Sequence, residues 1–118
     1  MLCTRDLDAP ADARQWLATY FSSNLDGRAL ADAQLVVSEL VTNAIRHAHG
    51  EIELCAAALG RVLHIEVTDE TPDCDPVTIP QASHGSGGRG LRLVDAVALA
   101  WGCRVGPDRK VVWADLAL

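Results

Sequence analysis

Three polar side chains recur at a spacing of four near the middle of the sequence. Glu39, Asn43 and His47 occupy positions i, i+4 and i+8 of a segment with helical periodicity, so they share one edge of the predicted helix. The amide oxygen of Asn43 suits a hard cation such as Mg²⁺, and the Glu39 carboxylate can orient or deprotonate a nucleophile. Taken alone, the row fits an ordinary solvent-facing edge with intrahelical hydrogen bonds better than it fits a ligand site.

A glycine cluster between His84 and Leu91 opens a further predicted helix. Gly85, Gly87 and Gly90 match the pattern G-x-G-x-x-G, and backbone N–H groups at a helix start favour phosphate. The cluster follows a proline-rich loop rather than a strand, and too little chain remains for a βαβ crossover. These two features argue against a dinucleotide-binding fold. No G-K-[ST] follows the cluster, so it is not a Walker A loop either. A flexible hinge remains the alternative to a phosphate site.

Asp69 ends a predicted strand and precedes a loop over residues 69–86 that contains Pro72, Pro76 and Pro80. Its carboxylate can accept a hydrogen bond from an amino group such as that of adenine. It can equally serve as a turn-forming residue. A loop this long in a compact domain is most often a lid or a binding loop.

The elements that position these residues follow from hydrophobic periodicity. We predict helices over residues 10–24, 29–48 and 87–100, and strands over 51–59, 61–68, 101–105 and 110–118. Turns at Gly60 and at 106–108 make two antiparallel hairpins. This order predicts an α+β fold, a two-layer α/β sandwich with a mainly antiparallel sheet and three helices on one face, in a single domain over residues 1–118.

Composition limits the classes of function. The formal net charge of −6 and the absence of a basic stripe disfavour nucleic acid and anionic membranes as partners. No apolar run approaches the roughly 20 residues that span a bilayer, and the first residues lack the layout of a signal peptide, so we expect a cytoplasmic protein. The four cysteines are scattered without a C-x-x-C pair, which predicts thiols with no shared task.

The order and spacing of the polar segments resemble the N, G1 and G2 boxes of the GHKL, or Bergerat-fold, ATPase superfamily. The corresponding segments are residues 39–47, 69–72 and 88–91, and the likeness runs from about residue 12 to the C-terminus. The short length and residues 37–44 and 106–116 look like the anti-sigma-factor serine/threonine kinases of bacteria.

The resemblance implies a site for Mg-ATP. Asn43 would coordinate the Mg²⁺ that bridges the triphosphate, Glu39 would act as a base or position a water, and Asp69 would bind the adenine amino group. Phosphates would lie against the backbone N–H groups at the start of the third helix. The other residues assigned to the nucleotide site are Pro72, which would shape the adenine loop, Gly88, Arg89, Gly90 and Leu91 of the third segment, and His47, with Arg46 near it.

The same branch implies a kinase that phosphorylates a serine of a STAS-type anti-anti-sigma partner, sequesters a sigma factor and forms a homodimer. Three departures from the pattern bear on phosphoryl transfer. The G1 segment lacks the glycines of the form D-x-G-x-G, Val111 and Val112 stand where many relatives carry a threonine, and no arginine immediately precedes the glycine cluster. A catalytically silent nucleotide-binding module that switches partner binding is therefore the alternative. The catalytic piece of a sensor histidine kinase ranks lower.

Overall fold

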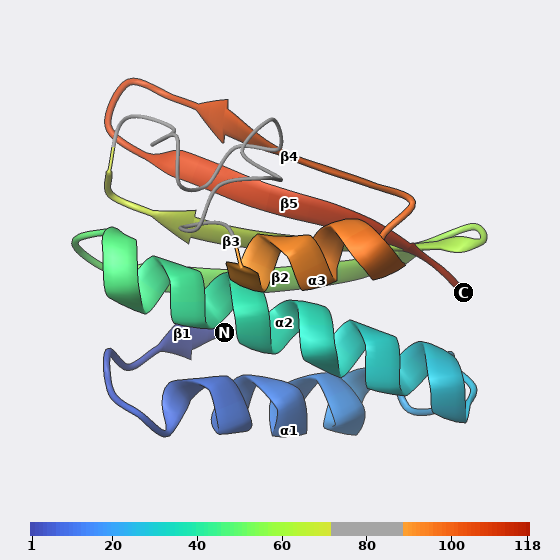
Figure 1. Cartoon of the computed structure of the whole chain (residues 1–118). Coiled ribbons are helices and arrows are strands. Elements are labelled where there is room, and N and C mark those ends of the chain that lie inside the picture. Colours follow the sequence, from blue (N-terminus) through green and yellow to red (C-terminus); the bar gives the residue numbers. More distant parts are fainter. Residues whose placement is uncertain (72–88) are drawn as a thin grey trace.

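The structure is a computed structural model, and it describes residues 1–71 and 89–118, without the side chains of residues 89 and 90. The elements follow one another along the chain as in Figure 1. They are β1 (Leu2–Cys3), α1 (Ala9–Phe21), α2 (Gly27–His47), β2 (Ile52–Leu59), β3 (Val62–Asp69), α3 (Arg89–Val97), β4 (Ala100–Val105) and β5 (Lys110–Ala117).

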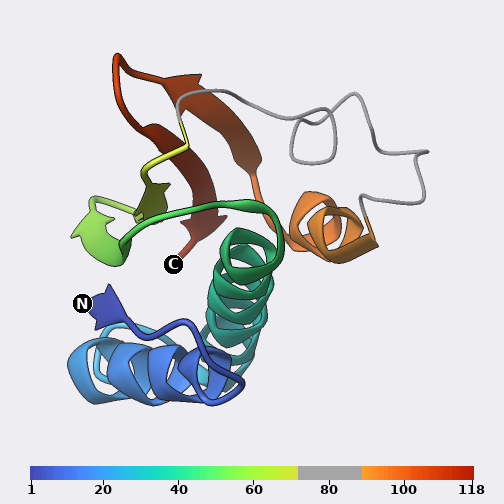
Figure 2. The same cartoon turned by 90° about the vertical axis from the view of Figure 1, so that its left-hand side faces the viewer.

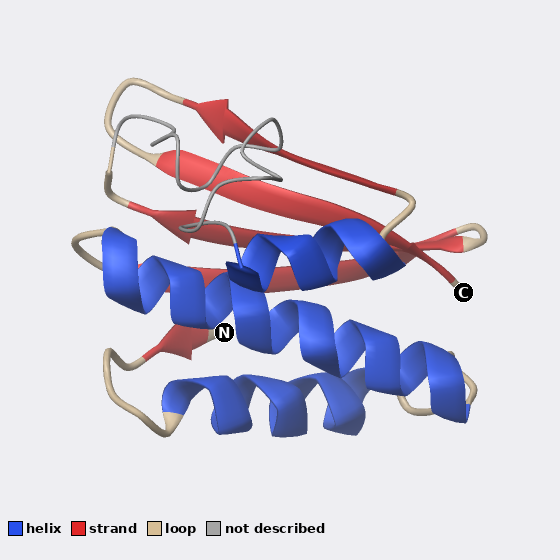
Figure 3. Ribbon diagram, viewed as in Figure 1, coloured by secondary structure: helices blue, strands red, loops and turns tan. Residues whose placement is uncertain are grey.

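The described strands form one five-stranded sheet in the order β1-β2-β3-β5-β4, with antiparallel pairing between all neighbours. The three helices cover one face of this sheet and leave the other face open (Figure 3). The predicted α+β fold with a mainly antiparallel sheet is confirmed. Strand β1 was not predicted, because two residues that pair Leu2 with Glu53 and Cys3 with Ile52 are too few to show an alternation.

Helix α2 is the central helix of the layer and contacts both α1 and α3 (Figure 2). The Asp26 side chain caps it by accepting a hydrogen bond from the Ala29 backbone N–H at 2.8 Å. The helix therefore begins at Gly27, two residues before the predicted start. Predicted ends were also too late for α1, which stops at Phe21, and for α3, which stops at Val97.

The core lies between the helices and the inner face of the sheet. Alternate residues of β2, β3 and β5 fill it from the sheet side, and they are Ile52, Leu54, Leu63, Ile65, Val67, Val112, Ala114 and Leu116. The opposing apolar side of α2 carries Val36, Val37, Leu40, Val41 and Ala44. Charged residues end this apolar alternation. The next inward positions are Asp69 on β3 and Lys110 on β5, and both residues are buried.

Two expectations from composition can be compared with the structure. Cys3 and Cys55 carry free thiols, but Cys103 is disulfide-bonded, so the prediction that no cysteine has a shared task is wrong for this residue. Scattered spacing did not reveal it, because a disulfide depends on proximity in space rather than in sequence. Over the described residues, none of the helices has the length and apolar character needed to cross a membrane.

Candidate functional site

Two of the predicted site residues, Asp69 and His47, lie at one end of the sandwich. Strand β3 ends there at Asp69 and β5 begins there at Lys110, since the two residues are register partners. The C-terminal end of α2 lies at the same end, on the left of Figure 1, whereas α3 begins near the middle of the view and runs away from that end. Helices α2 and α3 also pack against each other.

Asp69 is the most enclosed of the predicted site residues, with a side chain that is 1% exposed. Its Oδ1 atom accepts a hydrogen bond from the Thr71 backbone N–H at 2.8 Å. Its Oδ2 atom lies 3.6 Å from Nζ of Lys110. A carboxylate has about four lone-pair positions, so these two contacts leave it able to accept a further donor. The Asp69 carboxylate thus fits the expected role of receiving an amino group.

A second contact joins the end of β3 to the end of α2. The His49 backbone N–H donates to Oγ1 of Thr71 at 2.9 Å, and the Glu70 backbone N–H donates to the His49 carbonyl at 3.1 Å. The segment after α2 is therefore fixed to the segment that carries Asp69. These bonds bring two of the predicted boxes together although they are about 20 positions apart in sequence.

The row on α2 is placed as its spacing predicts. Glu39 and Asn43 are half-buried and His47 is exposed, while their neighbours Leu40 and Ala44 face the core. Burial raises the pKa of the Glu39 carboxyl above its usual range, and the positive charge of Arg46 partly opposes that shift. A carboxyl with a raised pKa that is still accessible has the properties of a general base.

The third predicted segment is described only in part. Arg89 and Gly90 are the first two residues of α3. The first N–H groups of a helix have no acceptor within the helix and can bind an anion. Leu91 is 3% exposed and belongs to the core, so its side chain anchors α3 and only its backbone is available to a ligand. Pro72 and Gly88 lie outside the described residues.

Sequence reasoning missed several residues that shape this end of the molecule. Lys110 carries a charge into the core layer beside Asp69. The strand alternation could have revealed it, because Lys110 shares its face with Val112 and Ala114. Arg5 donates to the carbonyls of Ile45, Ala48 and Gly50 at 3.1, 2.7 and 3.2 Å and so caps the end of α2. No local pattern announces a contact between residues 40 or more positions apart.

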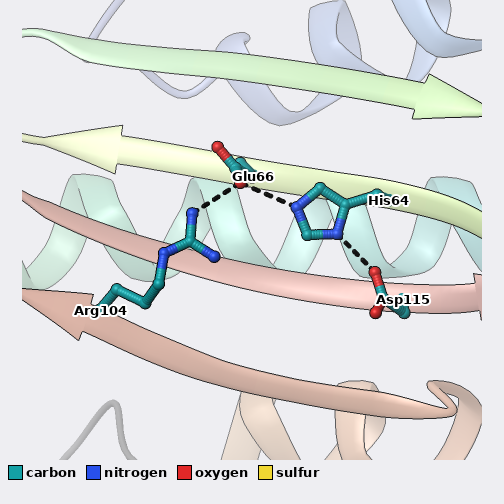
Figure 4. Close-up of polar contacts among 4 residues, drawn as sticks. All are labelled: His64, Glu66, Arg104 and Asp115. Carbon is teal, nitrogen blue, oxygen red and sulfur yellow. Dashed lines mark hydrogen bonds and ion pairs between the residues drawn. The ribbon is translucent and has the colours of Figure 1, made fainter.

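A separate polar cluster occupies the open face of the sheet (Figure 4). His64 lies between two carboxylates, with Nε2 at 2.8 Å from Glu66 and Nδ1 at 2.5 Å from Asp115. Hydrogen bonds to Glu66 and then Asp115 raise the pKa of His64. The pKa of Glu66 is lowered by its hydrogen bonds to His64 and Arg104. Helices do not cover this face, so the cluster is not part of the site around Asp69.

The comparisons with known proteins agree with this geometry. Residues 3–116 match the family model described as a histidine kinase-like ATPase domain. Among curated protein sequences there is no significant match. The histidine kinase domain of the Erythrobacter litoralis EL346 blue-light activated histidine kinase is similar, with a TM-score of 0.56 and 25% identity over 76% of this chain and 45% of that one.

Two further solved structures are similar in fold. A longer structure of the same Erythrobacter litoralis kinase gives a TM-score of 0.61 at 24% identity, over 80% of this chain and 32% of that one. The Acinetobacter baumannii histidine kinase AdeS gives 0.57 at 14% identity, over 99% and 66%. The chain spans less than half the length of the two Erythrobacter structures.

The family model covers almost the whole sequence, and the architecture agrees with it. The resemblance to GHKL-type ATPases, which rested on three short segments, is thereby confirmed at the level of the superfamily. The chain belongs to the histidine kinase-like ATPase family.

Proposed function

We propose that this protein binds Mg-ATP at the end of the sandwich where Asp69 and the C-terminal half of α2 meet. The observation that carries the proposal is the buried Asp69 carboxylate, which can accept a further hydrogen bond at the end of β3. A charged group is seldom buried unless it is paired or used. The family match supplies ATP as the ligand class.

Different residues of the chain bind different parts of the nucleotide. Asp69 accepts a hydrogen bond from the adenine amino group, and the first backbone N–H groups of α3 take the phosphates. Asn43 is half-buried on the edge of α2, and its amide oxygen is the group that would bind a cation. Asn43 would hold Mg²⁺ through this oxygen, and the ion would supply positive charge that offsets the charge of the phosphates.

Beyond ATP binding, we propose that the protein is an anti-sigma serine/threonine kinase that acts in the cytoplasm as a homodimer. Its partners are a STAS-type anti-anti-sigma protein and a sigma factor. The raised pKa of Glu39 supports the kinase. A carboxylate one helical turn from Asn43 would accept the proton of the partner's serine hydroxyl as the γ-phosphoryl group passes to the serine oxygen and ADP leaves. Phosphoryl transfer otherwise needs positioning and charge neutralisation more than covalent help from the protein.

Titration calorimetry with ATP, with and without Mg²⁺, tests nucleotide binding. We expect Mg²⁺-dependent binding to the wild-type protein and to Asn24→Ala, an exposed asparagine in the turn after α1. We expect Asn43→Ala to fold normally and to lose the dependence on Mg²⁺. An Asn43→Ala variant that stays folded with unchanged ATP affinity would refute the assigned cation site. A wild-type protein that binds no ATP under either condition would refute the nucleotide site itself.

The kinase proposal needs a separate assay. The protein is incubated with Mg-ATP and a STAS-type partner, and the partner's mass is measured. We expect a gain of one phosphoryl group with the wild-type protein and a loss of rate by a factor of about 100 or more with Glu39→Gln. An unchanged partner mass, together with ATP-dependent partner binding, would identify the catalytically silent module instead.

A further inference from the structure

The side chain of Lys110 is the feature of the nucleotide end that the proposed function does not use. It is 2% exposed and lies on the core-facing side of β5, directly beside the end of β3. It is also the only lysine in the sequence. Lysine is among the residues least often fully buried, because its ammonium group is costly to remove from water without partners.

The contacts of the ammonium leave most of its hydrogen-bonding capacity unused. Among the residues that the structure describes, Nζ has one ionic contact, with Oδ2 of Asp69 at 3.6 Å. That distance is longer than a hydrogen bond between nitrogen and oxygen. An ammonium group carries three donors and no acceptor. The side chain of Lys110 is enclosed, and its ammonium has donors to spare beside a carboxylate that can also accept a further bond. A polar ligand can satisfy both groups at this place.

The two side chains together present an acceptor and a donor next to each other. Adenine presents the complementary pair, since its amino group is a donor and the ring nitrogens flanking it, N1 and N7, are acceptors. A phosphate fits this place poorly, because the Asp69 carboxylate stands beside the ammonium and repels an anion. The base, rather than the triphosphate, is therefore the part of the nucleotide that matches the pair.

We infer that Lys110 is a base-reading residue, whose ammonium donates a hydrogen bond to the ring nitrogen beside the amino group that Asp69 receives. The inference rests on the proposed ATP site and adds a specificity-determining residue to it. Asp69 alone recognises only an amino group, whereas the pair requires an amino group and an acceptor side by side. Guanine carries a carbonyl oxygen in place of the adenine amino group, which sets two acceptors against each other at Asp69.

The experiment compares ATP with 1-deaza-ATP and 7-deaza-ATP, which each replace one ring nitrogen by carbon. Affinities are measured by calorimetry for the wild-type protein and for Lys110→Met, which keeps the length of the side chain. We expect Lys110→Met to weaken the binding of ATP roughly 10- to 100-fold, which is the range for a hydrogen bond from a charged donor. One of the two analogues should bind the wild-type protein more weakly by a similar factor and be insensitive to the substitution. That analogue identifies the nitrogen.

Arg109→Met is the matched control, because it removes a positive charge from the adjacent residue, whose side chain is 57% exposed. We expect it to leave all three affinities within about 2-fold, as a surface change does. If Lys110→Met weakens the binding of ATP and of both analogues by the same factor, Lys110 is only a counter-ion that holds Asp69 in place, and the inference is wrong. Unchanged affinity for ATP in Lys110→Met would also overturn it.

A second measurement avoids the substitution, since removing one member of a buried ion pair can prevent folding. In wild-type protein with ¹⁵N-labelled lysine, the side-chain ammonium signal comes from Lys110 alone. We expect ATP to shift this signal and to slow its hydrogen exchange, and we expect one deaza analogue to do neither. Equal shifts with all three nucleotides would overturn the inference while leaving ATP binding intact. Absence of ATP binding in the wild-type protein would overturn both the inference and the proposed function.

Discussion

Replacing Arg5 by methionine should destabilise the whole domain although the residue lies outside every regular element. Methionine keeps much of the apolar stem and removes the guanidinium that reaches the carbonyls of Ile45, Ala48 and Gly50. The last carbonyls of a helix have no partner within the helix. In a longer helix, the Ile45 carbonyl would receive the His49 N–H, but that group donates to Thr71 instead. Arg5 supplies the replacement donor.

The magnitude follows from these contacts. Two of the three hydrogen bonds are exposed and one is half-buried, so each contributes about 0.5–1 kcal/mol, at the low end for intramolecular bonds. A cation at a helix C-terminus adds about 0.5 kcal/mol. We therefore expect Arg5→Met to lower the free energy of unfolding by about 2–3.5 kcal/mol. In urea, that corresponds to a decrease of the midpoint by roughly 1–2 M.

Urea unfolding followed by circular dichroism measures the change, and Arg28→Met is the matched control. Arg28 is exposed in the first turn of the same helix, and the same substitution there should change stability by less than about 0.5 kcal/mol. Hydrogen exchange should also become faster at residues 45–50 of Arg5→Met, because the end of α2 opens locally. A loss of stability no larger than that of Arg28→Met would refute the reasoning about the cap.

Three further changes have expected outcomes. Thr71→Val should lower the free energy of unfolding by about 1–2 kcal/mol and weaken the binding of ATP, because the His49 N–H loses its acceptor. Thermal unfolding with and without ATP measures both effects. Gly50→Ala should lower the melting temperature, because Gly50 has φ of +76° and a Cβ would overlap the Glu70 side chain. His64 has a raised pKa, so its stabilising effect is complete below about pH 6.5, its unfolded value, and is lost as pH rises through the folded value. The stability difference between wild-type protein and His64→Gln should therefore shrink from pH 6 to pH 9 in urea titrations, and a constant difference would contradict this.

The sheet and helices could be predicted from the sequence because their signals are periodic. Leu63, Ile65 and Val67 alternate with polar residues, and the apolar positions of residues 29–48 recur at helical spacing. The ends of the elements were less accurate, since a single cap decides them. Asp26 starts α2 two residues before its apolar stripe begins to show.

The residues of the candidate site could be predicted from the sequence, but their arrangement in space could not. The row on α2 and the position of Asp69 follow from spacing along one element. The contacts that join these elements, from Arg5 to α2 and from His49 to Thr71, connect residues that are 22 to 45 positions apart. Such contacts depend on how elements pack, which no local pattern contains. Lys110 is different, because its face could be read from β5 once the strand was assigned.

Stability alone does not explain why a lysine and an aspartate occupy the inner face of this sheet. An apolar pair at the same positions would continue the alternation of Val67 and Val112 and would be as stable or more stable, since buried ion pairs recover their desolvation cost poorly. Arg5 is the opposite case, because its bonds satisfy carbonyls that the helix leaves open, and stability accounts for it fully. A position that breaks the pattern of the fold without a structural gain is where function is expected. By that criterion, the Asp69–Lys110 pair supports the proposed ligand-binding end of this molecule more directly than any of its sequence motifs.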